Sequence, residues 1–317
     1  MQRYLLAALV AFFISLFFCF MLIPLLRRLK AGQNILFYVK EHKSKSGTPT
    51  MGGLAFVTAA VLTAVLFIGK VERTFVITLA IGLAYMAVGL IDDFLKRKHK
   101  ENLGLRAWQK FAFQTAIAVA AGCYCIRAGL TTLHVPFFAA SIELGLWTLP
   151  LAVFVFLSTV NAVNLTDGLD GLASGVSVPF FLTLGIIVSI QAGGDMIPTL
   201  CFALVGALLA YLLFNVPPAS VFMGDTGSLS LGGFAACIGV FTGNALYIAI
   251  VGLPFVFSVI SVIMQVIYYK ATGGKRVFLM SPVHHHFQQK GYSESKISYA
   301  YFVISLIAGV ACIAATL

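Results

Sequence analysis

Charged residues are scarce in this sequence of 317 residues. Asp, Glu, Lys and Arg together make up 10% of the chain, whereas soluble domains carry roughly 25%, so an ordinary soluble protein is excluded. Hydrophobic residues make up 60%, and the mean hydropathy is +0.98. Crossing a bilayer takes about 20 consecutive apolar residues, and such stretches run almost from end to end. The composition therefore predicts an all-α polytopic membrane protein with a single domain over residues 1–317.

Cysteine pairs of the metal-binding kind are also absent. None of the six cysteines belongs to a CxxC motif or has a histidine at metal-ligand spacing, which argues against a structural zinc site. All of them lie in or beside apolar stretches, so we interpret them as small core residues. They are Cys19, Cys123, Cys125, Cys201, Cys237 and Cys312.

Hydropathy predicts about ten transmembrane helices. They are expected near residues 4–26, 51–69, 74–93, 107–127, 147–163, 172–192, 197–214, 228–243, 245–268 and 297–315. The first apolar run lacks the small-residue cleavage site of a signal peptide, so it is kept as a helix. The segment from about 128 to 146 is the longest connection on its side, and a short interfacial element is expected there.

The basic residues indicate which way the chain crosses the membrane. Of the 21 Lys and Arg residues, 17 fall after the first, third and ninth predicted helices. By the positive-inside rule these loops are cytoplasmic and both termini are periplasmic. The net charge of +10 then reflects the orientation of the chain in the membrane, and no nucleic-acid partner is implied. For most of these residues, contact with anionic membrane lipid is the simpler alternative to a catalytic role.

Acidic residues are few, and five aspartates gather at predicted cytoplasmic helix ends. Carboxylates at membrane depth are costly, so they suggest function, with a proton relay or structural pairing as the alternative. Asp92 and Asp93 repel each other unless a cation or shared proton relieves them. A divalent cation is the simplest relief, and neutralisation by Lys96 and Arg97 is the alternative.

Two further segments join aspartates to glycines. In NAVNLTDGLDG, residues 161–171, Asp167 and Asp170 share a face if the stretch is helical; a capping role for the next helix is equally open. In the segment 215–228, Asp225 stands between glycines and hydroxyls and is a plausible Mg²⁺ ligand. The following helix N-terminus is expected to offer N–H groups to a phosphate. Phe222 could stack on a base or face lipid.

Histidines and lysines complete the set of polar segments. His284, His285 and His286 are consecutive, so they cannot all face one metal from regular structure, and hydrogen bonding or charge toward phosphate is the expected role; exposed loop histidines without a role are the alternative. KSKSGTPTMGG, residues 43–53, combines basic, hydroxyl and glycine residues. It lacks the order of a Walker loop, and a helix-capping turn is the alternative.

Five segments, in this order, closely resemble the polyprenyl-phosphate N-acetylhexosamine-1-phosphate transferase superfamily, and most specifically its muramoyl-pentapeptide branch. They are KSKSGTPTMGG, the Asp92-Asp93 pair, NLTDGLDG, VFMGDTGS and SPVHHHF. The resemblance spans nearly the whole chain, and the HHHF form distinguishes this branch from the N-acetylglucosamine branch. Two positions depart from the usual pattern, Gln288 in place of Glu and Tyr292 in place of Trp. They bear on fine substrate contacts and not on the reaction.

The resemblance implies a Mg²⁺-dependent enzyme of the bacterial cytoplasmic membrane. The implied reaction joins UDP-N-acetylmuramoyl-pentapeptide and undecaprenyl phosphate to give lipid I and UMP. Asp225 would hold Mg²⁺, and Asp92 or Asp93 would position or deprotonate the lipid phosphate and complete the metal site. The catalytic set would also contain His284 and His285. Substrate contacts are implied for Lys45, Thr50, Lys96, Asn164, Asp167, Gly168, Leu169, Asp170, Asn215, Phe222, Gln265 and His286. Dimerisation through membrane helices is plausible.

Three other functions are weighed against this one. A transporter would place its carboxylates near the bilayer midplane in broken helices, whereas these lie at helix ends. A sister transferase would use UDP-N-acetylglucosamine. An aromatic prenyltransferase also uses aspartate clusters and Mg²⁺, but its paired Asp-rich helices differ from the HHHF and GTPTMGG segments.

Overall fold

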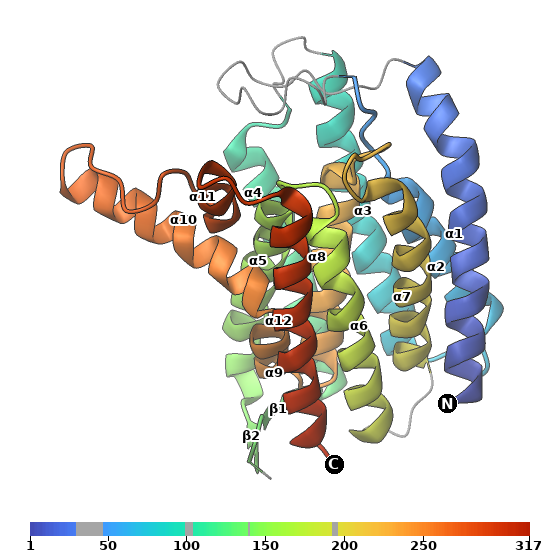
Figure 1. Ribbon diagram of the computed structural model, residues 1–317. Helices are drawn as coiled ribbons and strands as arrows, with labels where there is room; N and C mark the ends of the chain where they lie inside the picture. Colours follow the sequence, from blue (N-terminus) through green and yellow to red (C-terminus); the bar gives the residue numbers. More distant parts are fainter. Residues whose placement is uncertain (30–46, 99–103, 139, 192–195) are drawn as a thin grey trace.

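The chain forms a bundle of helices with one short hairpin (Figure 1). The computed structural model describes residues 1–29, 47–98, 104–138, 140–191 and 196–317. Its helices are α1 (Gln2–Arg28), α2 (Gly53–Leu66), α3 (Arg73–Lys98), α4 (Ala107–Ala128), α5 (Thr148–Thr166), α6 (Leu172–Gln191), α7 (Met196–Asn215), α8 (Gly224–Phe241), α9 (Ala245–Val251), α10 (Leu253–Ala271), α11 (Val283–Gln289) and α12 (Glu294–Ala314).

Eight of the described helices are long and apolar enough to cross a membrane: α1, α3, α4, α5 with the turn before it, α6, α7, α10 and α12. The chain is therefore a multi-pass membrane protein. Helix α2 is apolar but has only 14 residues, and α8 does not meet the same criterion. Both termini lie at one end of the bundle and α11 at the other (Figure 1). The prediction of ten crossings, with its orientation, stays a prediction.

Helix α8 is the central element of the bundle. Every residue from Asp225 to Phe241 is buried, and α3, α5 and α2 pack around it. Its sequence is rich in Gly, Ser and Ala, which lets neighbouring backbones approach closely. For example, the Ser230 hydroxyl donates to the Gly82 carbonyl of α3 at 3.0 Å. The helix begins at Gly224, four residues before the predicted start, so Asp225 lies in its first turn and not in the preceding loop.

The ninth predicted helix, 245–268, is wrong as a single helix. The segment is divided into α9 and α10 at Gly252. Pro254 lies in the first turn of α10, where its missing N–H costs nothing, whereas in a continuous helix it would remove a hydrogen bond. The break lets α10 extend away from the bundle toward the end where α11 lies (Figure 1).

The segment before α5 contains a two-stranded hairpin and a helical turn. Strands β1 (Thr132–Val135) and β2 (Ala140–Glu143) pair antiparallel, with Thr132 opposite Glu143. The short element expected in this segment is therefore a hairpin, followed by the 3-10 turn η2 (Gly145–Trp147). The hairpin lies at the end of the bundle that carries the chain termini (Figure 1).

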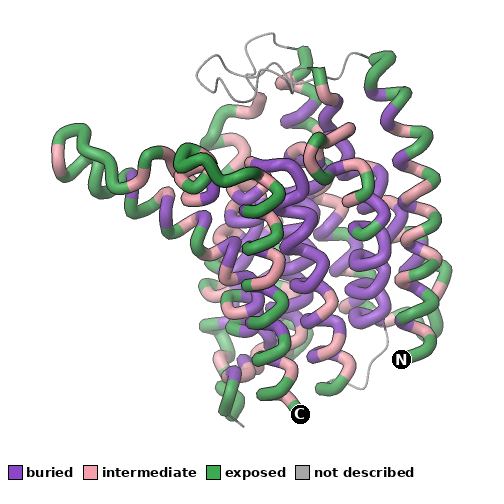
Figure 2. The backbone as a smooth tube through the Cα atoms, viewed as in Figure 1, coloured by how far each residue is buried: buried purple, intermediate pink, exposed green. Residues whose placement is uncertain are grey.

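Burial divides the bundle into an inner and an outer layer. Helices α6, α7 and α8 are buried along most of their length, whereas one face of α1 and the distal part of α10 are exposed (Figure 2). The exposed face of α1 is apolar: Leu5, Phe13, Phe17 and Phe20 are each more than half exposed. In a membrane protein such a face contacts lipid and needs no protein partner.

The packing of α1 against α7 depends on Gly206. A Cβ atom at this position would lie 1.8 Å from the carbonyl oxygen of Ala8, so the two backbones are in direct contact. About two turns of α1 further along, the Ser15 hydroxyl donates to the Ala207 carbonyl at 2.8 Å. Close backbone approach and a cross-helix hydrogen bond are the usual means of holding helices together in lipid.

We expect Gly206→Ala to destabilise the protein by about 1–3 kcal/mol, because backbone atoms cannot move aside as a flexible side chain can. Thermal unfolding in detergent measures the change. Gly175→Ala in α6 is the matched control: a Cβ there meets no heavy atom within 4 Å, so better helix propensity should leave the melting temperature unchanged or raised. Equal melting temperatures for the two variants would contradict the contact between α1 and α7.

Candidate active site

Three aspartates meet where α3 and α8 touch. Asp92 and Asp93 lie near the end of α3, Asp225 lies in the first turn of α8, and one carboxylate oxygen of each lies within 4.8 Å of the others. All three are buried, with 2%, 1% and 9% of their surfaces exposed. The structure thus brings the three predicted metal ligands together. We name Asp92, Asp93 and Asp225 the acid cluster.

Asp93 binds the N-terminus of α8. Its carboxylate accepts hydrogen bonds from the backbone N–H groups of Asp225 at 3.1 Å and Thr226 at 3.0 Å, and from the Thr226 hydroxyl at 2.7 Å. The first N–H groups of a helix have no partner within the helix and attract negative charge. The expectation that this N-terminus offers these groups to a phosphate is therefore wrong for Asp225 and Thr226, whose N–H groups are already used.

Gly89 allows α3 to come close enough for this cap. A Cβ atom at Gly89 would lie 2.1 Å from the carbonyl oxygen of Asp225 and 2.6 Å from the nitrogen of Thr226. Asp93 follows Gly89 by four residues, so it lies one turn further along the same face of α3. The contact that places Gly89 against Asp225 also directs Asp93 to the end of α8.

Two lysines neutralise the acid cluster. The Lys96 ammonium lies 2.7 Å from Asp92 Oδ2 and 3.0 Å from Asp225 Oδ2, and the Lys110 ammonium lies 2.5 Å from the same Asp225 oxygen. The pairing of Lys96 with Asp92 is the neutralisation that was the alternative to a divalent cation, and its contact with substrate stays a prediction. Arg97 instead donates to the carbonyl of Leu29 at 2.7 Å.

Lys110 was missed as a site residue by the sequence analysis, which counted it only among the basic residues. It lies in the first turn of α4, and no local motif marks it. Asn164 joins the same group: its amide donates to Asp225 Oδ1 at 2.8 Å and to the Ser228 hydroxyl at 2.9 Å. The residue expected to contact a nucleotide therefore orients the Asp225 carboxylate.

The acid cluster fits a divalent cation of the Mg²⁺ type, which prefers carboxylate oxygens. Asp92 and Asp225 turn oxygens toward Lys96, so a cation could replace an ammonium there. The Thr50 hydroxyl is buried and has no hydrogen-bond partner among the described residues. A Cβ atom at Gly224 would lie 2.4 Å from Asp93 Oδ2 and 2.6 Å from Thr50 Oγ1, so this hydroxyl borders the acid cluster.

The glycine-rich segment 167–171 is a turn and not a helix. Helix α5 ends at Thr166, so the condition under which Asp167 and Asp170 would share a helix face is not met. The Asp170 carboxylate accepts from the Ala219 N–H at 2.9 Å, and the Asp170 N–H donates to Glu294 at 3.1 Å. Burial, with the negative charges of Asp225, Asp93 and Asp170, raises the pKa of Asp167 to about 8. At neutral pH its protonated carboxyl group can donate a hydrogen bond.

The three histidines lie on α11, and their side chains point in two different directions. A Cβ atom at Gly168 would lie 2.6 Å from His284 Nε2 and 3.0 Å from His285 Nε2, so these two imidazoles face the turn after α5. The third, His286, accepts a hydrogen bond from the Leu279 N–H at 3.1 Å. This division agrees with the prediction that the three cannot face one ligand together.

His284 is the most enclosed of the three. It is 0% exposed, and neither of its ring nitrogens has a hydrogen-bond partner among the described residues. Burial, reinforced by the neighbouring His285, lowers the pKa of His284 to about 3. The imidazole of His284 is therefore neutral and lacks partners in the described part of the chain, which costs free energy in a buried polar group; its contact with substrate stays a prediction.

The remaining predicted substrate contacts are built into the protein in different ways. Asn215 accepts from the Ser174 hydroxyl at 2.6 Å and donates to the Val221 carbonyl at 3.0 Å, so it braces the loop before α8. The N–H of Phe222 donates to the carbonyl of Pro49 at 2.8 Å, which ties that loop to the segment before α2. Leu169 is 4% exposed and belongs to the core.

Two further predicted contacts lie apart from these. The Gln265 amide bonds the backbone of Val277 and Phe278, so the hydrogen bonds that it makes run to the loop after α10 and not to the acid cluster. Lys45 lies outside the described residues.

Comparison with known proteins places the chain in a family. The model of Glycosyl transferase family 4 matches residues 74–243, which include the acid cluster. The first phospho-N-acetylmuramoyl-pentapeptide-transferase signature matches residues 45–57.

Relatives of the same name are similar over almost their whole length. The phospho-N-acetylmuramoyl-pentapeptide-transferase of Listeria monocytogenes serotype 4b (strain F2365) is 42% identical over 307 residues, covering 95% of this chain and 94% of the relative. Those of Clostridium perfringens (strain SM101 / Type A) and Clostridium botulinum (strain Eklund 17B / Type B) are 42% and 43% identical, covering 95% of this chain and 93% of each relative. The chain therefore belongs to the phospho-N-acetylmuramoyl-pentapeptide-transferase family.

Proposed function

We propose that the chain transfers phospho-N-acetylmuramoyl-pentapeptide from its UDP-linked donor to undecaprenyl phosphate. The products are lipid I and UMP, and the reaction takes place at the cytoplasmic face of the bacterial inner membrane. Membership of the family supports this function. The single structural observation that carries it is the buried acid cluster, with two lysines bound to it, at one end of a helical bundle.

The reaction exchanges one phosphate for another. An oxygen of the lipid phosphate attacks the phosphorus that carries the sugar, and the bond from that phosphorus to the bridging oxygen breaks, so that UMP leaves with the bond's electron pair. Both substrates are anionic, so their repulsion is the main obstacle, and positioning with charge stabilisation supplies most of the catalysis. An aspartyl-phosphate intermediate is the alternative route.

The residues of the acid cluster would have different roles in this reaction. Asp225 and Asp92 would hold Mg²⁺, which neutralises diphosphate charge and polarises the phosphorus centre. Lys96 and Lys110 would then be available to pair with phosphate oxygens. Either Asp92 or Asp93 would receive the proton of the lipid phosphate: Asp93 caps the N-terminus of α8, and Asp92 accepts from the Leu105 N–H and pairs with Lys96.

His284, His285 and the turn after α5 would bind the donor. The ring nitrogens of His284 have no partner among the described residues, and the carboxyl group of Asp167 has a raised pKa. Both side chains would therefore offer hydrogen-bonding groups in neutral form. Neutral donors add specificity for a uridine or sugar without adding charge to a site that already holds two lysines and a cation. Asn215 and Gln265 support the surrounding loops, so we assign them positioning roles.

Asp225→Asn should reduce UMP release by about 10²-fold or more, because removing one contact to the metal or to the developing charge usually costs this much. The rate is measured with both substrates and Mg²⁺ in detergent. Glu143→Gln is the control, a carboxylate changed to an amide on the hairpin at the other end of the bundle (Figure 1), and it should leave the rate unchanged. Near-normal turnover of Asp225→Asn would remove its proposed role.

Donor choice separates the proposed function from its nearest alternative. UMP should be released with UDP-N-acetylmuramoyl-pentapeptide and not with UDP-N-acetylglucosamine, each supplied with undecaprenyl phosphate. Turnover with the second donor alone would identify a sister transferase. Movement of substrate across vesicles without UMP release would indicate a transporter, although the position of the acid cluster near the end of α3 disfavours that function.

His284→Ala should lower the rate by about 10–10³-fold without changing the shape of the pH–rate profile between pH 6 and 9. The reason is that burial lowers the pKa of His284 to about 3, so this side chain stays neutral throughout that range. Profiles of wild type and variant, recorded with saturating Mg²⁺, provide the comparison. A difference in slope that appears only below pH 7 would mean that a protonated His284 takes part.

The same burial makes folding stability depend on pH. Below pH 6.5 the unfolded chain protonates His284, whereas the folded chain does not until about pH 3. Wild type should therefore lose stability relative to His284→Ala as the pH falls from 6.5 toward 3, by about 1.4 kcal/mol per pH unit. Melting temperatures of both proteins at pH 7.5 and 5.5 test the sign, and a constant difference would contradict it.

A further inference from the structure

Gln288 is one of the two positions at which the sequence departs from the usual pattern, and the structure gives it two polar neighbours. It lies on α11. Its Oε1 atom lies 3.1 Å from His285 Nδ1, and its amide nitrogen donates to Glu294 Oε1 at 3.3 Å. An imidazole, an amide and a carboxylate are thus joined in series. We name His285, Gln288 and Glu294 the hydrogen-bond relay.

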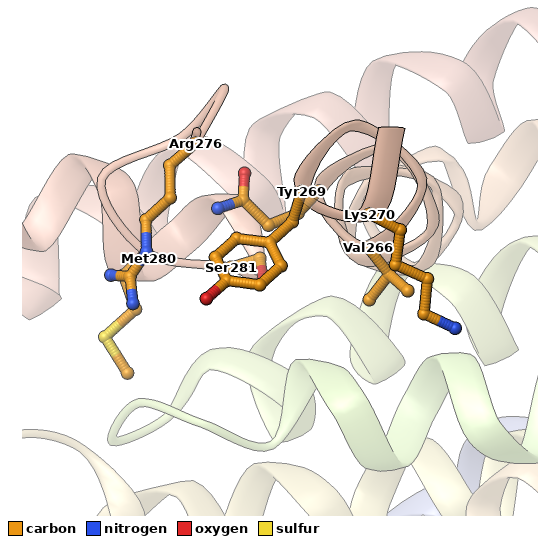
Figure 3. A pocket seen from close by; sticks show the side chains of 7 residues that line it. Val266, Tyr269, Lys270, Arg276, Met280 and Ser281 are labelled. Carbon is orange, nitrogen blue, oxygen red and sulfur yellow. The ribbon is translucent and has the colours of Figure 1, made fainter. Parts of the chain in front are cut away.

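Helix α11, which carries two members of the relay, is held on two sides. On one side lies the loop after α10: the Val283 N–H donates to the Ser261 hydroxyl at 2.9 Å, and Met280 and Ser281 of the loop line a cavity with Tyr269 of α10 (Figure 3). On the other side the relay joins α11 to the beginning of α12. The relay is therefore built on a helix whose position is fixed.

Glu294 is the anchored end of the relay. Its Oε2 atom accepts from the Asp170 N–H at 3.1 Å, and the Ser298 hydroxyl of the same helix donates to the Asp170 carbonyl at 3.1 Å. Glu294 also lies in the first turn of α12, where a negative charge is favourable. Two bonds and a helix N-terminus therefore hold this carboxylate beside Gln288.

The chemistry of the groups determines the direction of each bond. An ionised carboxylate only accepts hydrogen bonds, so Gln288 must turn its NH₂ group toward Glu294. The amide oxygen then faces His285, and because this oxygen also only accepts, the proton must be on Nδ1 of the imidazole. In a neutral imidazole the other nitrogen is an acceptor. The relay thus makes Nε2 of His285 a hydrogen-bond acceptor.

The Nε2 atom of His285 faces the turn after α5. A Cβ atom at Gly168 would lie 3.0 Å from it, so the turn approaches this nitrogen without a side chain. An acceptor at this place can bond a hydroxyl or N–H group of a sugar or base, whereas a protonated nitrogen would favour a phosphate oxygen. The position of one proton therefore decides which part of a substrate this histidine can bind.

We propose that Gln288 and Glu294 are positioning residues that hold the proton of His285 on Nδ1, so that Nε2 accepts a hydrogen bond from a hydroxyl or N–H group of the UDP-linked donor. The identity of that ligand rests on the proposed function, whereas the proton position does not. Gln288 in place of Glu also avoids two carboxylates at a separation of 3.3 Å, which would repel each other.

An exchange of the two side chains tests the relay in the full chain. Gln288→Glu brings two carboxylates together, and Glu294→Gln removes the group that orients the amide. Each change alone should lower kcat/KM for the UDP-linked donor by about tenfold, comparable to the loss when the outer partner of a metal-binding histidine is removed. The control is Gln289→Glu, which makes the same charge change at the exposed neighbouring position and should leave kcat/KM unchanged.

The double variant, Gln288→Glu with Glu294→Gln, should recover most of the activity. A carboxylate at position 288 can accept from His285 Nδ1. An amide at position 294 can donate to that carboxylate while its oxygen accepts the Asp170 N–H, so every bond keeps its direction. A merely structural role would instead make the two losses accumulate. A double variant no better than the weaker single variant would overturn the proposal, as would full activity in either single variant.

Nitrogen-15 NMR of the histidine-labelled protein locates the proton without any turnover. Spectra recorded at about pH 8.5, where histidine is ordinarily neutral, are assigned by comparison with His285→Asn. Wild type and the double variant should show His285 protonated on Nδ1, and a proton on Nε2 in wild type would overturn the relay. Absence of UMP release by wild type would instead contradict the proposed function, and the NMR result would still decide the position of the proton.

Discussion

The bond between the Asp93 carboxylate and the first N–H groups of α8 is the constraint on which the site depends. It joins the end of the membrane helix α3 to the beginning of α8 and fixes the direction in which Asp225 points. Gly89 makes the bond possible because no side chain separates the two backbones. A carboxylate at this depth would be costly alone, but here it is matched by the partial positive charge of a helix N-terminus.

The arrangement of charge around the acid cluster follows from this constraint. Once Asp225 is held beside Asp92, their negative charges require cations, and Lys96 and Lys110 supply them from two different helices. In such a site a metal ion can replace an ammonium at the carboxylates, and the displaced ammonium can then pair with a phosphate, so that no carboxylate is left without a cation. A transfer between two anionic substrates requires that every buried charge is compensated throughout the reaction.

The sequence was sufficient for the helical membrane fold, because hydropathy determines it, and for the segments that meet at the site. It was insufficient where contacts between residues far apart in the chain determine which side chains meet. Nothing near Asp93 indicates that it caps α8, and nothing near Lys110 indicates its contact with Asp225, 115 residues away. The break between α9 and α10 did have a local signal, in Gly252 and Pro254, that the apolar run obscured. Asn164 and Asn215 were recognised as important residues, but their hydrogen-bond partners could not be deduced from spacing.

The central claim is that the contact of α3 with α8 assembles a metal site, and binding of Mn²⁺ in place of Mg²⁺, followed by electron paramagnetic resonance, tests it most directly. Wild type and Gly175→Ala should each bind one ion per chain with equal affinity. Gly89→Ala should bind it at least about tenfold more weakly, with unchanged helical content by circular dichroism, because its methyl group displaces Asp225. Mn²⁺ binding by Gly89→Ala as tight as that of wild type would contradict the account.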